Sequence, residues 1–351
     1  MKVLNWFELE WKDFTEGPAL YHTSYAELAL PLGARKLGYH AEILPPRTAF
    51  CPYHAHLVNE ELFVVLGGEP SVRLDGIEHR LAAGDLLAVP PGSRGVHQLL
   101  NRSDRPAHVL AASTMTPREV VDYPDSGKRL IAVQGLAVDP AEGSEGSDGG
   151  PRPESRARAL LRDGREVDYF DGEPPFDLFA SDPAPPAARD PRIVSLADVP
   201  WERFAMGPFG GERKRLAKRA GARLLGFSLY RLQFGQRPWP FHLHHVNEEF
   251  FYVRSGYGQL RTSEGAQALK PGDAFACLPG PEGAHAIQNT GDAPLEYLAL
   301  STMEEPEIVE YPDSGKIGVM VGSPPGGDPA RRARALVFRT NDAVDYLADE
   351  R

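Results

Sequence analysis

The feature that most constrains this chain is an internal repeat. Shifted by 188 residues, the sequence matches itself without a gap from His54 to Lys128, which fall on His242 and Lys316. Turn and motif residues recur along this stretch, and so does the run Tyr-Pro-Asp-Ser-Gly-Lys at its end. A gapless long-period match indicates two copies of one structural unit. The 351 residues are enough for two domains that each bury a core.

Within a repeat, the apolar segments are short and rich in β-branched and aromatic residues. Turn sequences such as Gly67-Gly68 and Asp75-Gly76 separate them, and the chain is rich in turn formers, with Gly 35 and Pro 33. Short strands with such spacing predict an all-β sandwich or barrel. In the first repeat, the predicted strands are residues 62–66, 71–74, 86–89, 96–100 and 107–112.

We therefore expect an N-terminal barrel over residues 1–137 and a C-terminal barrel with a trailing segment over 191–351. Residues 138–190 are rich in Pro, Gly and acidic residues, a composition that cannot bury a core, and we predict a linker that is partly docked or disordered. Aromatic residues between 170 and 179 are candidates for the docking contact. The aromatic lead-ins of the repeats, with Trp6, Trp11, Trp201 and Phe204, are candidates for a contact that packs the barrels as an intramolecular pseudo-dimer. Whether the chain also forms a homo-oligomer stays open.

Composition excludes several classes of partner. A formal net charge of −11 argues against nucleic acid held through phosphates, and no apolar stretch is long enough for a membrane span. Cys51 and Cys277 lie at non-equivalent places in the two repeats, so we expect no disulfide framework. Because no secretory signal is visible at the start of the chain, we expect a cytoplasmic location. We also expect a small-molecule substrate.

Each repeat carries a candidate metal-ligand set. His54 and His56 are two residues apart, so on a strand both imidazoles point to the same face. The second repeat has His242 and His244 at the same spacing, and a third imidazole follows some forty residues later, as His97 or His285. Three neutral imidazoles and a carboxylate suit a divalent transition metal (Mn, Fe, Ni, Co, Cu or Zn) and leave positions open for substrate or dioxygen. We predict two such sites per chain.

The carboxylate of each set must be chosen from two adjacent glutamates, Glu60-Glu61 and Glu248-Glu249. If Glu249 faces inward, Phe251 and Val253 do so too, and Arg254 lies in solvent. If Glu248 faces inward, Arg254 is driven into the barrel, where an unpaired charge is expensive. We therefore predict Glu61 and Glu249 as ligands, which requires the chain to turn at Val246-Asn247 after His244.

These residues resemble the two motifs of the cupin superfamily. The first motif is present as His-x-His, a glutamate, and a glycine after six further residues; the second is present as Pro-Gly, His and Asn. The stretch between Pro-Gly and the third histidine is about two residues longer than the motif in both repeats. The resemblance implies a bicupin of two jelly-roll barrels whose metal ligands are His54, His56, Glu61, His97, His242, His244, Glu249 and His285.

Bicupins include oxalate decarboxylases and some dioxygenases, so the resemblance implies a metal-dependent enzyme acting on a small organic molecule. We expect an oxidoreductase of the dioxygenase kind, with decarboxylase, isomerase or lyase chemistry on the same metal as alternatives. A non-catalytic bicupin that binds a sugar or another small ligand is the second class of function. A third interpretation, one catalytic and one structural site, also stays open, and no catalytic residue is assigned.

Overall fold

The structure is a computed structural model that describes residues 1–134, 156–173, 179, 183–184 and 186–350. The chain divides into two compact units, and neither is continuous in sequence. The first-repeat unit contains Trp11–Ala26 and His40–Ile193, and the second-repeat unit contains Met1–Glu10, Glu27–Tyr39 and Val194–Arg351. The contiguous boundaries expected from the sequence stay a prediction.

In the first repeat, a seven-stranded sheet faces a four-stranded sheet, and both are antiparallel wherever register is defined. The larger sheet has the order β17 (Ile193–Ser195), β10 (Asp85–Val89), β7 (Glu61–Gly67), β12 (Ala107–Thr114), β4 (Leu37–Leu44), β3 (Thr23–Glu27), β2 (Lys12–Phe14). The smaller has the order β5 (Thr48–Ala49), β11 (His97–Asn101), β8 (Ser71–Leu74), β9 (Ile77–Arg80).

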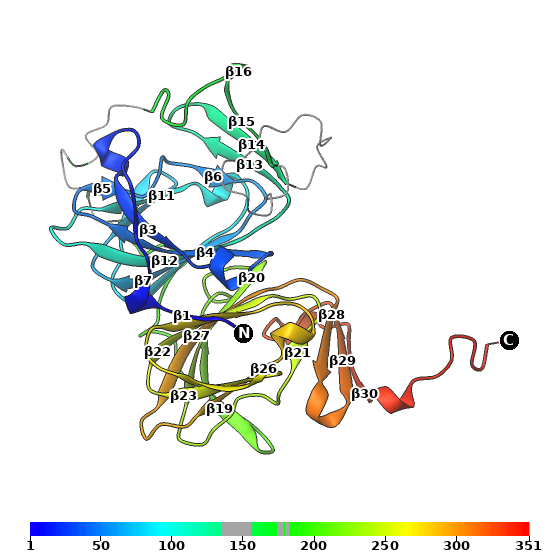
Figure 1. Ribbon diagram of the computed structural model, residues 1–351. Coiled ribbons are helices and arrows are strands. Elements are labelled where there is room, and N and C mark those ends of the chain that lie inside the picture. The colour runs from blue at the N-terminus through cyan, green and yellow to red at the C-terminus, as the bar shows by residue number, and fades with distance from the viewer. Residues whose placement is uncertain (135–155, 174–178, 180–182, 185, 351) are drawn as a thin grey trace, which may run out of the picture. The chain divides into compact units, whose positions relative to one another are not determined.

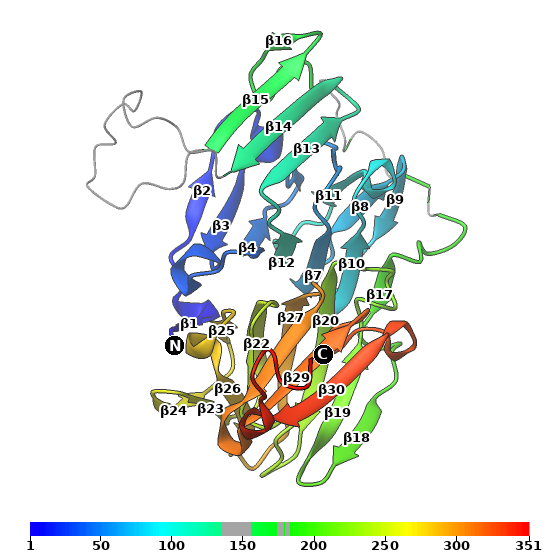
Figure 2. The same ribbon diagram turned by 90° about the vertical axis from the view of Figure 1, so that its right-hand side faces the viewer.

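A third sheet carries His56, the second histidine of the first pair. Its order is β16 (Arg165–Glu166), β15 (Arg156–Arg162), β14 (Lys128–Gln134), β13 (Arg118–Tyr123), β6 (Ala55–His56). Figure 2 shows β13 to β16 side by side. β15 lies inside the range 138–190, where the sequence predicts a linker, and it pairs with β14 over six residues. This strand is a docked part of the range expected to be a linker, and the linker boundaries themselves stay a prediction. The Gly- and Ser-rich run 141–150 lies outside the described residues.

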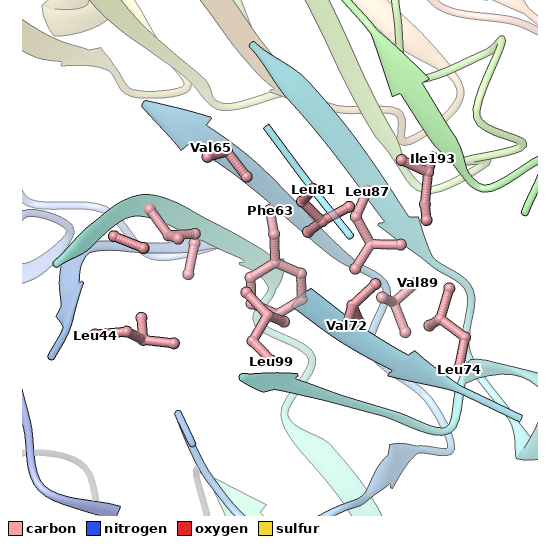
Figure 3. Packing of buried hydrophobic residues seen from close by; sticks show 13 residues of the cluster. Leu44, Phe63, Val65, Val72, Leu74, Leu81, Leu87, Val89, Leu99 and Ile193 are labelled. Carbon is pink, nitrogen blue, oxygen red and sulfur yellow. The ribbon is translucent and has the colours of Figure 1, made fainter. Parts of the chain in front are cut away.

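The first core fills the space between the two facing sheets (Figure 3). Phe63 lies at its centre, with Leu87 and Val89 from β10 on one side and Leu44 from β4 on the other. The alternate residues of β7, Phe63 and Val65, both belong to this cluster, as expected of a strand with one face toward a core. Burying side chains of this size contributes roughly 1.5–3 kcal/mol each, which makes this cluster the main source of the barrel's stability.

The second repeat reproduces this arrangement. Its larger sheet has the order β1 (Val3–Asn5), β25 (Asp273–Cys277), β22 (Glu249–Ser255), β27 (Leu295–Thr302), β20 (Leu225–Leu232), β19 (Phe209–Arg215), β18 (Glu202–Met206). The facing sheet is β24 (Gly265–Leu269), β23 (Gly258–Thr262), β26 (His285–Asn289), and the third sheet is β21 (Leu243–His244), β28 (Glu307–Tyr311), β29 (Lys316–Val321), β30 (Arg334–Arg339). Figure 1 shows β28, β29 and β30 side by side.

The edge strand of the second barrel comes from the start of the chain. β1 pairs with β25, with Val3 opposite Phe275, and Trp6 packs edge-on against Tyr252 of β22. In the first repeat, the corresponding core position is taken by Ile193. The aromatic lead-in of the second repeat packs on its own barrel, since Phe204 stacks on Trp239 and the Trp201 ring lies against the Arg231 guanidinium.

The five strands predicted in the first repeat are confirmed as β7, β8, β10, β11 and β12, with bounds that differ by two residues at most. The described residues contain 3-10 helices and no α-helix. No helix in the described part of the chain is long and apolar enough to cross a membrane. The 3-10 helices are η1 (Trp6–Glu8), η2 (Ala19–Tyr21), η3 (Leu30–Leu32), η4 (Ser93–Gly95), η6 (Pro281–Gly283), η7 (Pro312–Ser314), η8 (Pro329–Arg331) and η9 (Thr340–Asp342).

Candidate metal centres

In each repeat, the structure brings together the three imidazoles and the carboxylate that the sequence singled out. The first and third histidines face each other across an isolated antiparallel bridge: the His97 backbone N–H donates to the His54 carbonyl at 2.8 Å. The Glu61 carboxylate completes the first cluster, with Oε2 3.2 Å from His97 Nε2 and Oε1 3.5 Å from His56 Nε2. Ligand atoms of His54, His56 and Glu61 lie within 4.8 Å of one another.

The second cluster has nearly the same geometry. His285 N–H donates to the His242 carbonyl at 2.8 Å, and Glu249 Oε2 lies 3.4 Å from His285 Nε2 and 3.5 Å from His244 Nε2. Ligand atoms of His242, Glu249 and His285 again lie within 4.8 Å of one another. Imidazole and carboxylate side chains are rarely buried in a core for packing alone. The same cluster in both repeats therefore indicates a functional site.

The position of the glutamates follows from a bend in the chain. β21 ends at His244 and β22 begins at Glu249, so the chain bends between the two strands as the choice of Glu249 requires. Phe251 and Val253 then enter the core, and the Arg254 side chain is half exposed. Glu248 points away from the cluster: its Oε2 accepts the backbone N–H groups of Arg35 and Lys36, and its Oε1 accepts that of Leu37.

Each imidazole turns its Nε2 atom toward the cluster because its Nδ1 atom faces an acceptor elsewhere. Nδ1 of His54 lies 2.9 Å from the Pro52 carbonyl and Nδ1 of His97 lies 2.9 Å from the Gly95 carbonyl. His242 and His285 have the same partners two residues earlier, Pro240 and Gly283. An Nδ1 that donates to a carbonyl fixes the tautomer and leaves the Nε2 lone pair free to bind a metal ion.

The second histidine of each set is oriented by a carboxylate that the sequence reasoning missed. His56 Nδ1 lies 3.3 Å from Glu119 Oε2, and His244 Nδ1 lies 3.2 Å from Glu307 Oε2. Glu307 also accepts the backbone N–H groups of Val246 and Asn247, so it holds the bend that positions Glu249. The signal was present, because Glu119 and Glu307 are identical residues at the repeat spacing.

The lengthened turn before the third histidine is a 3-10 helix that places the histidine's acceptor. A Cβ atom added at Gly95 would lie 1.9 Å from the Pro90 carbonyl oxygen, and one at Gly283 would lie 1.8 Å from the Leu278 carbonyl oxygen. Only glycine allows this close approach. The carbonyl groups of these two glycines are the acceptors for the third histidines, so the turn positions the ligand.

Burial and neighbouring charges set the protonation of the imidazoles. Burial, reinforced by the other two imidazoles, lowers the pKa of His54 to about 3, and burial lowers that of His97 to about 3 as well. Burial also opposes protonation of His56, but Glu61 and Glu119 beside it outweigh this effect and raise its pKa. The first and third histidines are therefore neutral, the state in which imidazole binds metals.

Buried ligand atoms that lack hydrogen-bond partners also indicate that the clusters fit a metal ion. Among the described residues, Glu61 Oε2, His97 Nε2 and Glu249 Oε2 are buried atoms without a hydrogen-bond partner. Since His97 Nδ1 faces the Gly95 carbonyl, its Nε2 lone pair faces a carboxylate oxygen only 3.2 Å away. Two buried acceptors this close repel each other unless a cation lies between them.

Further residues flank the clusters, most of them alike in the two repeats. Tyr123 stacks on His54 and Tyr311 on His242, and the turn after each tyrosine is held by a matching ion pair, Asp125 with Arg73 and Asp313 with Arg261. The Tyr-Pro-Asp-Ser-Gly-Lys runs are thus structural turns. Cys51 Sγ lies 3.4 Å from His54 Nδ1, whereas the second repeat has Trp239 at that position.

Two antiparallel sheets closed around a core define a jelly-roll barrel, present here twice, and each barrel carries a His₃Glu cluster that could hold a metal ion. Residues 41–113 and 228–301 each match the family model described as Cupin domain, and the chain is accordingly a bicupin. Comparison with curated proteins gives no match.

Solved structures with a similar arrangement share little sequence with this chain. An oxalate decarboxylase from Lactobacillus farciminis, solved as a formate complex, is 17% identical, with a TM-score of 0.48 and coverage of 86% of this chain and 85% of that chain. A putative glyoxylate-induced protein from Pseudomonas aeruginosa is 14% identical, with a TM-score of 0.48 and coverage of 79% of each chain. A putative sugar phosphate isomerase from Acidithiobacillus ferrooxidans is 24% identical, with a TM-score of 0.37 and coverage of 43% of this chain and 91% of that chain.

Proposed function

We propose that this bicupin binds one divalent transition-metal ion at each His₃Glu cluster and is a metal-dependent enzyme that acts on a small organic substrate. The observation that supports it is the convergence of three Nε2 atoms and one carboxylate in each repeat, with their other polar atoms already bonded elsewhere. The ligands are His54, His56, Glu61 and His97 in the first repeat and His242, His244, Glu249 and His285 in the second.

The protein's own contribution is to hold this geometry and a fixed protonation state. Carbonyl groups orient two imidazoles of each set, and Glu119 or Glu307 orients the remaining one. When bound, the metal supplies Lewis-acid chemistry and, if it is redox-active, electron transfer at an open coordination position. Buried aromatic residues beside the clusters, Phe63 and Phe251, provide the apolar wall that keeps solvent from the third histidine.

Elemental analysis tests the first half of the proposal. We expect two metal ions per chain after saturation, one after His97→Ala or His285→Ala, and none after both. A chelator should leave both hydrophobic cores buried, because apolar side chains between the sheets pack each of them. A saturated wild-type chain that holds at most one ion would contradict the proposal.

Within this class we propose dioxygenase chemistry as the first reaction to test. The iron-loaded chain should be incubated with small carboxylates, enediols and phenols, and oxygen uptake recorded. Uptake that depends on both substrate and metal supports a dioxygenase. Turnover that continues without oxygen points to a decarboxylase, an isomerase or a lyase, and binding without turnover of any compound points to a ligand-binding bicupin.

A further inference from the structure

The two metal clusters are nearly identical, but the barrel walls beside them are not. The inward-facing residues of β4 are His40, Glu42 and Leu44, since Leu44 belongs to the core and strand side chains alternate. The corresponding residues of β20, at the same repeat spacing, are Ser228, Tyr230 and Leu232. The first barrel therefore has an imidazole and a carboxyl group where the second has a hydroxyl and a phenol.

Glu42 is an unusual residue for the interior of a barrel. Its side chain is only 3% exposed, and within the described residues its Oε1 atom has no hydrogen-bond partner. Its Oε2 atom lies 3.7 Å from His40 Nε2, and the His40 side chain is 32% exposed. The pair thus joins a buried acid to a group that solvent can reach. An acid with an unpaired buried oxygen costs stability, which is a reason to look for a functional role.

Aromatic contacts connect this pair to the first metal cluster. Phe50 connects the two: His40 stacks on Phe50 at 5.8 Å between ring centroids, Phe50 packs edge-on against Phe63, and Phe63 lies 5.4 Å from His97. Cys51 gives a second connection, because burial and the charges of Glu61 and Glu42 all raise the pKa of this thiol, whose Sγ atom touches His54.

In the second barrel, an aromatic side chain with bonded polar atoms stands at the position of Glu42. Tyr230 stacks on Tyr297 at 5.2 Å with an interplanar angle of 9°, and its hydroxyl is paired with Arg213 and Trp239. The first barrel has Val109 in place of Tyr297 and Cys51 in place of Trp239, both much smaller. Glu42, Val109 and Cys51 of the first barrel thus stand where the second barrel has a packed group of three aromatic side chains.

We propose that Glu42 and His40 make the first barrel the acid–base site of the chain, acting on a small ligand held at the His54 cluster, while the second barrel lacks this function. This inference rests on the proposed metal function. The Glu42 carboxyl O–H bond breaks as its proton passes to the ligand. His40 then takes a proton from water, which leaves as hydroxide, and passes it to the Glu42 carboxylate. No oxidant or reductant is consumed, and the reverse sequence removes a proton from the ligand.

The protonation of Glu42 agrees with this role. Burial raises the pKa of Glu42 to about 8, against a smaller opposing effect of a hydrogen bond from Thr23. At neutral pH the group is therefore a neutral acid that can donate a proton and recover it. Two titratable groups lie near it: His40 on its own strand, 3.7 Å away, and Cys51, whose pKa the Glu42 charge raises.

Infrared spectroscopy tests the state of Glu42 without substrate or metal. The wild-type chain should show the C=O band of a protonated carboxyl group at pH 7 that disappears as pH rises through about 8, and Glu42→Gln should lack it. The matched control is Tyr230→Phe, which changes the equivalent position of the second barrel and should keep the band. Absence of the band in the wild-type chain would overturn the proposal.

Formate binding tests the role. Cobalt-loaded His285→Ala, in which the second set is incomplete, is titrated with formate while its visible absorption is recorded. Above pH 8 the formate dissociation constant of this variant should rise with pH, because binding requires the Glu42 proton. Its slope against pH should exceed that of the double variant, His285→Ala with Glu42→Gln, by about tenfold per pH unit. Equal slopes in the two variants overturn the proposal. A chain that takes up no cobalt refutes the proposed metal function, and the infrared band still decides whether Glu42 is protonated.

Discussion

The two adjacent glutamates of the second repeat should separate stability from metal binding. Glu248 is fully buried and accepts three backbone N–H groups at 2.9, 3.1 and 3.2 Å. In Glu248→Gln, one carboxylate oxygen becomes an NH₂ group that faces a donor, so at least one of these bonds is lost. A hydrogen bond to a charged acceptor contributes roughly 1.5–3 kcal/mol.

Burial raises the pKa of Glu248 against the effect of those N–H groups, so part of their contribution offsets the burial of the charge. We therefore expect Glu248→Gln to destabilise the metal-free second-repeat unit by about 1.5–3 kcal/mol, a fall in Tm of roughly 3–12 °C at this size. Its metal affinity should stay within about threefold of the wild type, because the carboxylate points away from the cluster.

Glu249→Gln should behave in the opposite way. Its Oε2 atom has no hydrogen-bond partner among the described residues and faces two imidazoles, so its loss should leave the metal-free Tm nearly unchanged. The metal affinity should fall at least tenfold, since a neutral amide oxygen replaces a charged donor. Calorimetric metal titration and thermal melts after chelation measure the two quantities. If Glu248→Gln releases metal while its Tm is unchanged, the inside-outside assignment of β22 is wrong. Glu60→Gln and Glu61→Gln should show the same contrast in metal affinity.

Three further variants test other parts of the reasoning. Glu307→Gln should weaken metal binding at the second cluster about 10–100-fold, since this carboxylate orients His244; equal affinity by calorimetry would contradict that role. Gly283→Ala should cost about 1–3 kcal/mol in denaturant unfolding and lower metal content, because its Cβ meets the Leu278 carbonyl oxygen at 1.8 Å; a variant with wild-type stability would show that the turn adapts freely. Phe251→Ala should cost about 3–5 kcal/mol, because Phe251 is buried in the second core among aromatic neighbours; a loss below about 1 kcal/mol would place it outside that core.

The repeat and the ligand residues could be predicted from the sequence because both depend on local spacing. Two histidines two residues apart must share a strand face, and a match at a shift of 188 residues imposes the same fold twice, as at His54 and His242. The choice of Glu249 over Glu248 also followed from alternation, once the charge of Arg254 was required to stay in solvent. The structure has the bend that this choice demands, and metal binding itself stays a prediction.

The remaining features depend on contacts between residues far apart in the chain, which spacing does not specify. Glu119 orients His56 from 63 residues away, and β1 completes the sheet of the second barrel from the opposite end of the sequence. β15 lies in a segment whose composition predicts a linker, yet it pairs with β14 on one side and β16 on the other, because hydrogen bonds from neighbouring strands can stabilise a strand of weak apolar pattern. Glu42 is the clearest case: the sequence shows only an acid within an apolar strand, and only the closed barrel buries it, leaves one oxygen unpaired and places it beside His40. Strand periodicity determines which face a side chain occupies, whereas tertiary packing determines what that face meets.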